Sequence, residues 1–160
     1  MEETLKQKPT GLVSVRRIKE ISFFINEKLS KPDITQIKSQ LEARLGFNAT
    51  LNLVNLILRA YYIYEEFPEE IVMEISVENV FEVANLIEFI PVGIDVTTDQ
   101  MNIPSRVLVE MVAISISHTR ALFGKAISGT TMDSTYLPIT DPIAASKVFF
   151  GEKIKDEELK

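Results

Sequence analysis

The stretch that decides the fold runs from Asn102 to Gly124, with the sequence NIPSRVLVEMVAISISHTRALFG. Its apolar residues recur three and four positions apart, which predicts an amphipathic helix of roughly twenty residues and about 30 Å. Asn102 is the expected N-cap, Pro104 suits the first turn, and Gly124 is the expected stop. The apolar face is wider than a lone surface helix can keep from water, so a sheet or a second helix must cover it.

The length of this helix would also suit a membrane span, but its polar residues argue against one. Arg106, Glu110, His118 and Arg120 interrupt the apolar stretch, and each is costly at the centre of a bilayer. The chain opens with the acidic MEETLK, which lacks the apolar core of a secretory signal. We therefore expect a soluble, cytoplasmic protein with no membrane insertion.

The composition limits the classes of protein to which this chain can belong. The chain has 160 residues, 46% of them hydrophobic, and a formal net charge of −6. We expect a single domain over residues 12–150, a flexible N-terminus over 1–11, and a charged, mobile tail over 151–160. The negative charge disfavours nucleic acid as a partner, because phosphate binding needs clustered Lys and Arg. The chain contains no cysteine, which excludes disulfides and thiolate metal sites.

Two segments in the N-terminal third show strand character. Residues 12–25 alternate between apolar and polar side chains with an imperfect inner face, which predicts a first strand. After a loop, Leu41, Leu45 and Phe47 suggest a second strand that is short or irregular.

The middle of the chain predicts two longer strands joined by a hairpin. Residues 50–64 form one of them, and a change of phase near Leu53 suggests a bulge or bend. Residues 71–83 show the cleanest alternation in the chain, with apolar residues on one face. The other face carries Glu74, Glu78 and Glu82. One face of the sheet is therefore expected to be apolar and the other acidic.

The remaining segments connect this sheet to helices. Residues 84–96 are apolar without a regular period, which indicates a crossover, and Asp141 with Pro142 opens a final helix. Strands followed by helices favour an α+β architecture, an antiparallel sheet with the helices collected on one side.

Residues that carry chemistry are sparse. His118 is the only histidine, so a zinc site of the usual multi-histidine kind is excluded, and a packed or interface role is favoured over a catalytic base. The glutamates at 74, 78 and 82 suit a solvated sheet face better than paired acid–base catalysis. No enzyme, metal or cofactor is therefore expected.

Several strings, taken in order, resemble the SecB family of protein-export chaperones. The resemblance covers most of the chain, from Arg17 to Pro142. The strings that carry it are KEISF at 19–23, LILR at 56–59, IVMEI at 71–75, NIP at 102–104 and YLPI at 136–139. None is specific alone, and their order and spacing make the match.

The resemblance implies a four-stranded antiparallel sheet with the long helix and a short C-terminal helix packed on one side, assembled as a dimer of dimers. It implies that hydrophobic grooves hold unfolded precursors and that an acidic patch on the exposed sheet delivers them to the motor SecA. By local match this docking patch falls on Glu20, Val72 and Glu74. Phe24 stands where the family has an acidic residue, and the tail lacks an obvious equivalent of the family's contact with the SecA zinc region.

We expect clients to bind in apolar grooves between the long helix, the crossover and the irregular strand. The crossover lacks a regular period, so its side chains cannot all point into one core. The expected lining residues are Leu45, Phe47, Leu86, Phe89 and Ile94.

Three functions remain open from the sequence. The first is an ATP-independent holdase that binds unfolded, presecretory polypeptides and passes them to SecA. The second is a SecB-like partner-binding module, such as a toxin–antitoxin-associated chaperone, outside general export. The third, an enzyme with an unrecognised site, has the least support.

Overall fold

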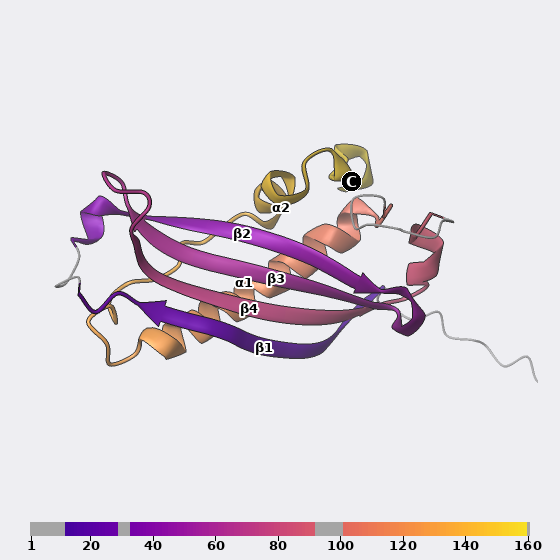
Figure 1. The fold of residues 1–160 in the computed structure, drawn as a ribbon. Helices are drawn as coiled ribbons and strands as arrows, with labels where there is room; N and C mark the ends of the chain where they lie inside the picture. Colours follow the sequence, from indigo (N-terminus) through magenta and orange to yellow (C-terminus); the bar gives the residue numbers. More distant parts are fainter. Residues whose placement is uncertain (1–11, 29–32, 92–100, 160) are drawn as a thin grey trace, which may run out of the picture.

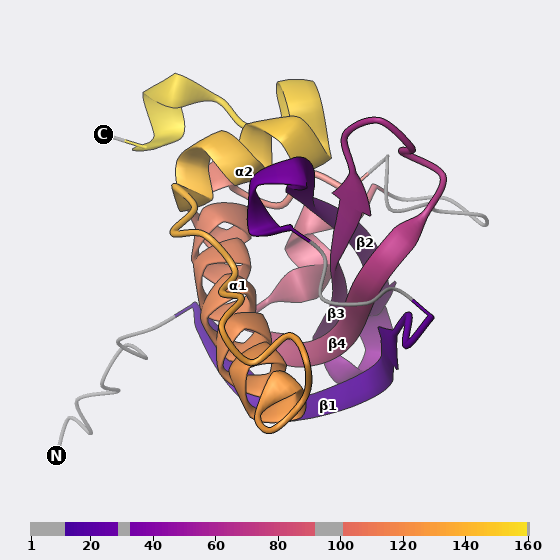
Figure 2. The same cartoon turned by 90° about the vertical axis from the view of Figure 1, so that its left-hand side faces the viewer.

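The computed structural model describes residues 12–28, 33–91 and 101–159 (Figure 1). Four strands, β1 (Val13–Ile25), β2 (Ile37–Asn48), β3 (Leu53–Tyr64) and β4 (Ile71–Val83), form one sheet in the order β1-β4-β3-β2. All three neighbouring pairs are antiparallel. Two α-helices follow, α1 (Ser105–Ile127) and α2 (Pro142–Phe150). Single 3-10 turns are η1 (Ile34–Gln36), η2 (Ala49–Leu51), η3 (Leu86–Phe89), η5 (Gly151–Lys153) and η6 (Asp156–Leu159). The predicted α+β fold, with its helices on one side of a four-stranded sheet, is confirmed (Figure 2).

The core lies between α1 and the two central strands. Side chains on β3 and β4 alternate, and those that face α1 are closed to solvent. The inward residues with 0% exposure are Val54, Leu56, Leu58, Ala60, Met73, Ile75, Val77, Phe81 and Val83. From α1, Met111 and Phe123 reach 0% and 1% exposure against this surface. The spacing of apolar residues in α1 and β4 therefore predicted their buried faces correctly.

β2 is a full-length strand, not the short or irregular one expected. Its register with β3 runs without a break from Ile37 opposite Tyr64 to Asn48 opposite Leu53, so of the predicted bulge or bend near Leu53 the bulge is wrong. The chain bends in η2, directly before Leu53. There the Asn48 side chain accepts a hydrogen bond from the Leu51 N–H, and Asn52 takes a left-handed φ of 55°.

β1 is an edge strand with two irregularities. Its register against β4 shifts once after Val15 and again after Glu20. Each shift resets the alternation of side chains, because an extra residue moves the following ones to the other face. Exposed apolar residues consequently recur every three positions, at Val15, Ile18, Ile21 and Phe24.

The ends of α1 differ from the prediction. The helix begins at Ser105 after Pro104, and the Asn102 side chain does not cap it; the Asn102 N–H instead donates to the Phe89 carbonyl at 2.8 Å. Gly124 lies inside the helix, which continues to Ile127. The left-handed residue after the helix is Gly129, with φ of 77°.

α2 begins as the sequence indicated. The Asp141 carboxylate accepts the Ile143 N–H at 3.0 Å, and Pro142 occupies the first turn. The helix buries Ala145 and Ser146 and leaves Ile143 and Val148 exposed.

Residues 151–159, which were expected to form a charged, mobile tail, fold against the start of α1. Ile154 is 7% exposed and joins the core, and the Glu158 carboxylate accepts the Ser105 N–H at 2.8 Å. We refer to Gly151–Leu159 as the capping segment. An acidic residue at a helix N-terminus is stabilised there by the free amides.

Candidate functional site

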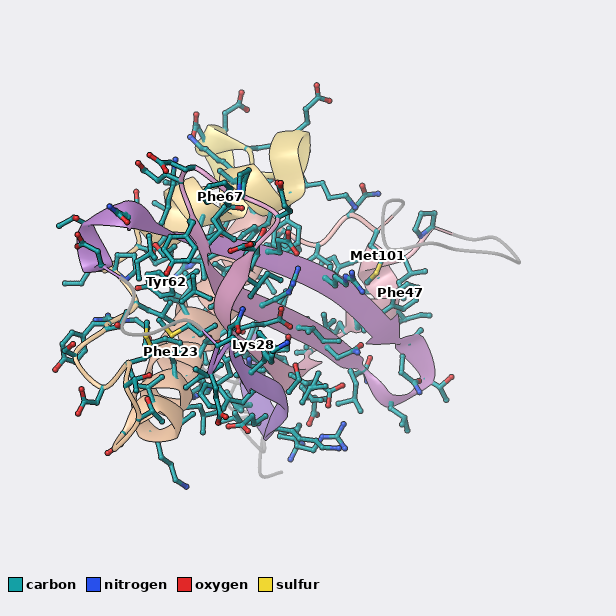
Figure 3. All side chains as sticks on the ribbon, turned by 60° about the vertical axis from the view of Figure 1, so that its left-hand side comes forward. Lys28, Phe47, Tyr62, Phe67, Met101 and Phe123 are labelled. Carbon is teal, nitrogen blue, oxygen red and sulfur yellow. The ribbon has the colours of Figure 1, made fainter. Side chains whose placement is uncertain are left out.

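Four of the five predicted groove residues lie in one apolar cluster at the end of the sheet where β4 leaves it. Leu86 is 0% exposed within this cluster, and Leu45, Phe47 and Phe89 are partly buried against it. Figure 3 shows Phe47 and Met101 at this end of the molecule. Ile94, the fifth residue, lies outside the described residues. Leu86 is therefore part of the core, whereas the other three line its margin.

Local backbone geometry positions η3 in this cluster. Asn85 takes a left-handed φ of 57°, which turns the chain away from β4 immediately before Leu86. The hydrogen bond from Asn102 N–H to Phe89 O then fixes the chain that enters α1 beside η3. The chain that leaves β4 and the chain that enters α1 are therefore joined next to η3.

A second apolar surface, which the sequence did not single out as a groove, follows the connection from α1 to α2. Tyr62 Oη donates to the Tyr136 carbonyl at 2.5 Å and holds this connection against β3. Leu137 is buried beneath it. The side chains left outside are Tyr136 at 75%, Ile139 at 87%, Ile143 at 39% and Val148 at 80% exposure. We call these four residues the exposed apolar strip.

The exposed apolar strip and the apolar cluster share α2. Phe149 and Phe150 of α2 pack against the cluster together with Phe47 and Phe89. Ile143 and Val148, on the same helix, stay in water. A sequence signal for the strip existed in the apolar composition of α2, but a nine-residue helix cannot show which side its neighbours cover.

The predicted docking patch is not brought together by the fold. Val72 is 1% exposed, so it offers almost no surface in this chain. Glu20 stands opposite Val77, an inward residue of β4, whereas Glu74 stands opposite Phe24. Residues directly opposite each other on antiparallel strands share a face, so the register separates Glu20 from Glu74.

Glu74 itself belongs to an ion-pair network on the outer face of the sheet. Arg59 donates from Nη2 to Glu74 Oε2 at 2.5 Å and from Nη1 to Glu42 Oε2 at 3.1 Å. The Arg59 guanidinium carbon lies 4.5 Å from the centroid of the Tyr61 ring, and Tyr61 Oη donates to Glu42 Oε1 at 2.8 Å. The hydrogen bond to Glu74 raises the pKa of Arg59, and the hydrogen bond from Tyr61 lowers the pKa of Glu42.

The other carboxylates of this face are paired as well. Arg17 Nη2 lies 2.7 Å from Glu78 Oε2, and Arg16 pairs with Glu82. The expectation of an acidic outer face is thus corrected to a face of alternating charge. The sequence of β4 alone reveals its glutamates, but the arginines that pair with them come from β1 and β3.

His118 contacts an amide and not a carboxylate. Its Nδ1 lies 2.6 Å from Asn79 Oδ1, and Asn79 is fully buried on the inward face of β4. Because an amide oxygen only accepts, the imidazole carries its proton on Nδ1. Burial lowers the pKa of His118. This geometry is that of a packed histidine between helix and sheet.

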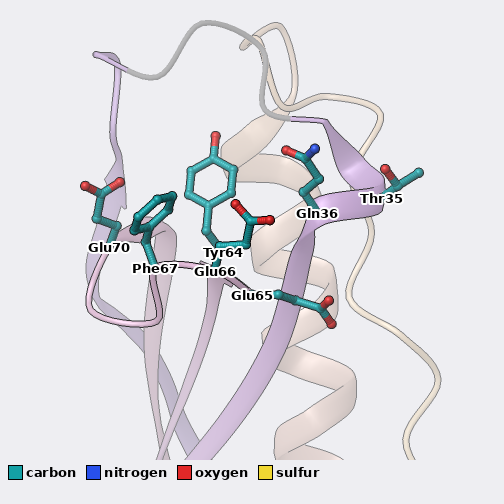
Figure 4. Close-up of a pocket in the computed structure, with 7 residues that line it drawn as sticks. All are labelled: Thr35, Gln36, Tyr64, Glu65, Glu66, Phe67 and Glu70. Carbon is teal, nitrogen blue, oxygen red and sulfur yellow. The ribbon is translucent and has the colours of Figure 1, made fainter.

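A hollow of about 360 Å³ lies at the β3–β4 hairpin, at the other end of the sheet from the apolar cluster (Figure 4). The rings of Tyr64 and Phe67 line it. Thr35, Gln36, Glu65, Glu66 and Glu70 complete its lining. These seven residues include three glutamates and no histidine, cysteine or lysine.

Comparison with solved structures identifies the class of fold. The chain is similar to the Mycobacterium tuberculosis Rv1957 SecB-like chaperone, solved in complex with a ChAD peptide from the Rv1956 HigA1 antitoxin. The TM-score is 0.52, with 11% sequence identity over 80% of this chain and 90% of that chain. The chain therefore has a SecB-like fold, and the resemblance drawn from sequence strings is confirmed at that level. No family model and no curated protein matches the sequence.

The fold also accounts for the hydropathy of α1. Over Ser105–Ile127 this helix is long and apolar enough to cross a membrane by those two criteria alone. Its apolar stripe, which includes Val107, Met111 and Phe123, is instead buried against the sheet. α1 is the core helix of the domain.

Proposed function

We propose that the protein is an ATP-independent holdase that binds unfolded polypeptides in the cytoplasm, without a cofactor and without catalysing a reaction. The observation that carries this proposal is the exposed apolar strip, together with the partly buried Leu45, Phe47 and Phe89, on a SecB-like fold. Two strip residues lie on the connection from α1 to α2 and two on α2 itself, and apolar surface of this kind can mark a binding site for polypeptide.

Unfolded polypeptides expose apolar side chains, and this apolar surface can bind them. The extended connection 136–140 and the neighbouring helix α2 present apolar side chains of several shapes, which suits many client sequences better than one. The SecB-like chaperone of similar fold was solved with a bound peptide, which supports a peptide as the class of ligand.

The second candidate function is the binding of one dedicated partner. The peptide in that solved structure comes from an antitoxin, and the outer face of the present sheet has its carboxylates paired with arginines. Both observations favour a dedicated partner-binding module over a general export chaperone. The two candidates use the same apolar surface and differ in the breadth of clients.

A more specific form of the export proposal is that bound clients are delivered to SecA. Of the predicted patch Glu20, Val72 and Glu74, only Glu74 lies accessible on the outer face of the sheet, so it would carry the docking, and it is held by Arg59. A basic partner would therefore have to displace Arg59 before it could use Glu74.

Assembly as a dimer of dimers is part of the proposal. β1 forms an edge of the sheet and exposes Val15, Ile18, Ile21 and Phe24. An edge strand with this much apolar surface needs a cover, and a second copy of the chain supplies one at low cost.

The holdase proposal predicts stoichiometric suppression of the aggregation of a denatured substrate, without nucleotide. The double variant Ile139→Ser/Val148→Ser should weaken client binding about tenfold or more, because two apolar side chains no longer contribute buried area. Both residues are at least 80% exposed, so the melting temperature should stay within a few degrees. Light scattering of the substrate measures the effect.

Phe67→Ser is the matched control for that experiment. Phe67 is 54% exposed, but it lies on the β3–β4 hairpin away from the strip, so its loss should leave suppression unchanged. A wild type that leaves aggregation untouched would remove the general holdase and favour the dedicated module. Equal losses in both variants would remove the role of the strip.

The oligomer proposal predicts a tetrameric mass by light scattering at micromolar protein. The variant Ile18→Lys/Ile21→Lys should lower that mass, because it places charges on the exposed edge strand. A monomeric mass for the wild type would contradict the proposal.

The docking proposal predicts that Arg59→Gln strengthens binding of a lysine-rich peptide at low ionic strength, since Glu74 then loses its cationic partner and Glu42 keeps only the hydrogen bond from Tyr61. Arg44→Gln removes the same charge from the neighbouring strand and is the control. Titration at two salt concentrations should show the larger gain for Arg59→Gln, and the gain should fall in high salt. Equal gains in the two variants would argue against docking through Glu74.

A further inference from the structure

The capping segment is attached to α1 by a small set of polar contacts around Ser105. The Ser105 N–H donates to Glu158 Oε2 at 2.8 Å. The Ser105 hydroxyl accepts the Lys155 N–H at 2.8 Å and donates to the Lys153 carbonyl at 3.1 Å. Lys153 Nζ also reaches the Met101 carbonyl at 3.4 Å. Figures 1 and 2 show the segment at the start of α1.

One of these contacts satisfies a free amide at the helix N-terminus, that of Ser105. A carboxylate at this position is favoured by the partial positive charge of the helix end. The hydrogen bond from the Ser105 N–H lowers the pKa of Glu158. The contribution of Glu158 to the attachment is therefore present at neutral pH and is lost as pH falls through that lowered pKa, while the contacts of the Ser105 hydroxyl and of Ile154 remain.

The apolar side of the segment packs on the same cluster as the predicted groove residues, and Lys153 bonds to Met101, next to the Asn102 that bonds to Phe89. Ile154 is buried in the apolar cluster, and Leu159 packs against it. Leu45, Phe47 and Phe89 pack against the same cluster. The segment thus occupies apolar surface that a client would otherwise contact.

The segment is also a weakly held part of the fold. It consists of two single 3-10 turns, and most of its side chains are in water. Lys155 and Asp156 are 65% and 75% exposed, so their ion pairs with Glu158 and Lys147 contribute little. Segments with few buried contacts open locally at much lower free energy than the core.

We propose that the capping segment is a tethered occupant of the client-binding surface and must leave before a client can bind next to η3. This inference rests on the proposed binding of unfolded polypeptides. Ile154 and Leu159 occupy positions that two apolar side chains of a client would otherwise take. The apparent dissociation constant for a client then equals the intrinsic value divided by the fraction of molecules with the segment open.

A reversible covalent lock tests this directly. The chain contains no cysteine, so Ser105→Cys/Lys155→Cys introduces a single pair. The 2.8 Å contact between Ser105 Oγ and the Lys155 N–H brings the two backbones within the range that a disulfide spans. The oxidised protein should bind a permanently unfolded polypeptide at least about tenfold more weakly than the reduced protein. The single variant Ser105→Cys, oxidised and reduced, controls for the loss of the serine.

Opening the segment should have the opposite effect. Ile154→Ser removes its buried anchor and should tighten client binding, whereas Phe67→Ser, on the β3–β4 hairpin, should leave client binding unchanged. Urea unfolding of both variants shows whether the domain remains folded. Equal client binding in the locked and reduced forms would overturn the tethered-occupant proposal and leave the holdase proposal standing. Absence of binding in every form would overturn both.

Discussion

The contact between the apolar stripe of α1 and the inward faces of β3 and β4 is the interaction on which the rest of the structure depends. The first half of the helix, including Val107 and Met111, belongs to one apolar cluster. Its last turns, with Phe123 and Ile127, belong to a second cluster around Tyr62 and Met73. Burying one such side chain contributes roughly 1.5–3 kcal/mol. A single hydrogen bond contributes about 0.5–1.5 kcal/mol, so apolar burial dominates the contact.

The polar contact between the two clusters has a different role. Asn79 and His118 meet where the helix crosses the middle of β4. Ser115 and Thr119, also buried, flank His118 on the same helix. Apolar surfaces slide over each other at low cost, whereas a buried hydrogen bond is lost when the helix shifts by one residue. We infer that this pair fixes the register of α1 on the sheet, and through it the position of Ser105 and the capping segment.

Once α1 covers the inner face, the apolar residues that remain outside indicate function. Two groups of them lie on the edge strand β1 and on the exposed apolar strip, where the proposed assembly and the proposed client binding would take place. The carboxylates on the outer face of the sheet are paired with arginines. The proposed client binding would therefore use the apolar surface around α2, and the capping segment would control it.

The sequence predicted those features that depend on periodicity within one element. The buried faces of α1 and β4 followed from spacing alone, and Asp141–Pro142 marked the start of α2. Features that depend on partners distant in sequence were missed. The α1 cap comes from Glu158, 53 residues away from Ser105, and the partners of Glu74 and Glu78 come from other strands. Local strings cannot show such pairings.

The same limit applies to the predicted sites. Of the predicted groove residues, Leu45, Phe47 and Phe89 lie at the margin of the apolar cluster, whereas Leu86 is buried in it, and the binding of clients there stays a prediction. The exposed apolar strip was missed, since exposure of Ile139 and Val148 depends on what α1 and β2 leave uncovered. Val72 was assigned to the surface although the fold buries it.

The central claim is that this surface binds unfolded polypeptide by burying apolar area. Calorimetric titration of the protein with a permanently unfolded polypeptide, at several temperatures and without nucleotide, tests this claim most directly. The account predicts saturable binding with a negative heat-capacity change. Absence of binding, or binding with no change in heat capacity, would contradict it.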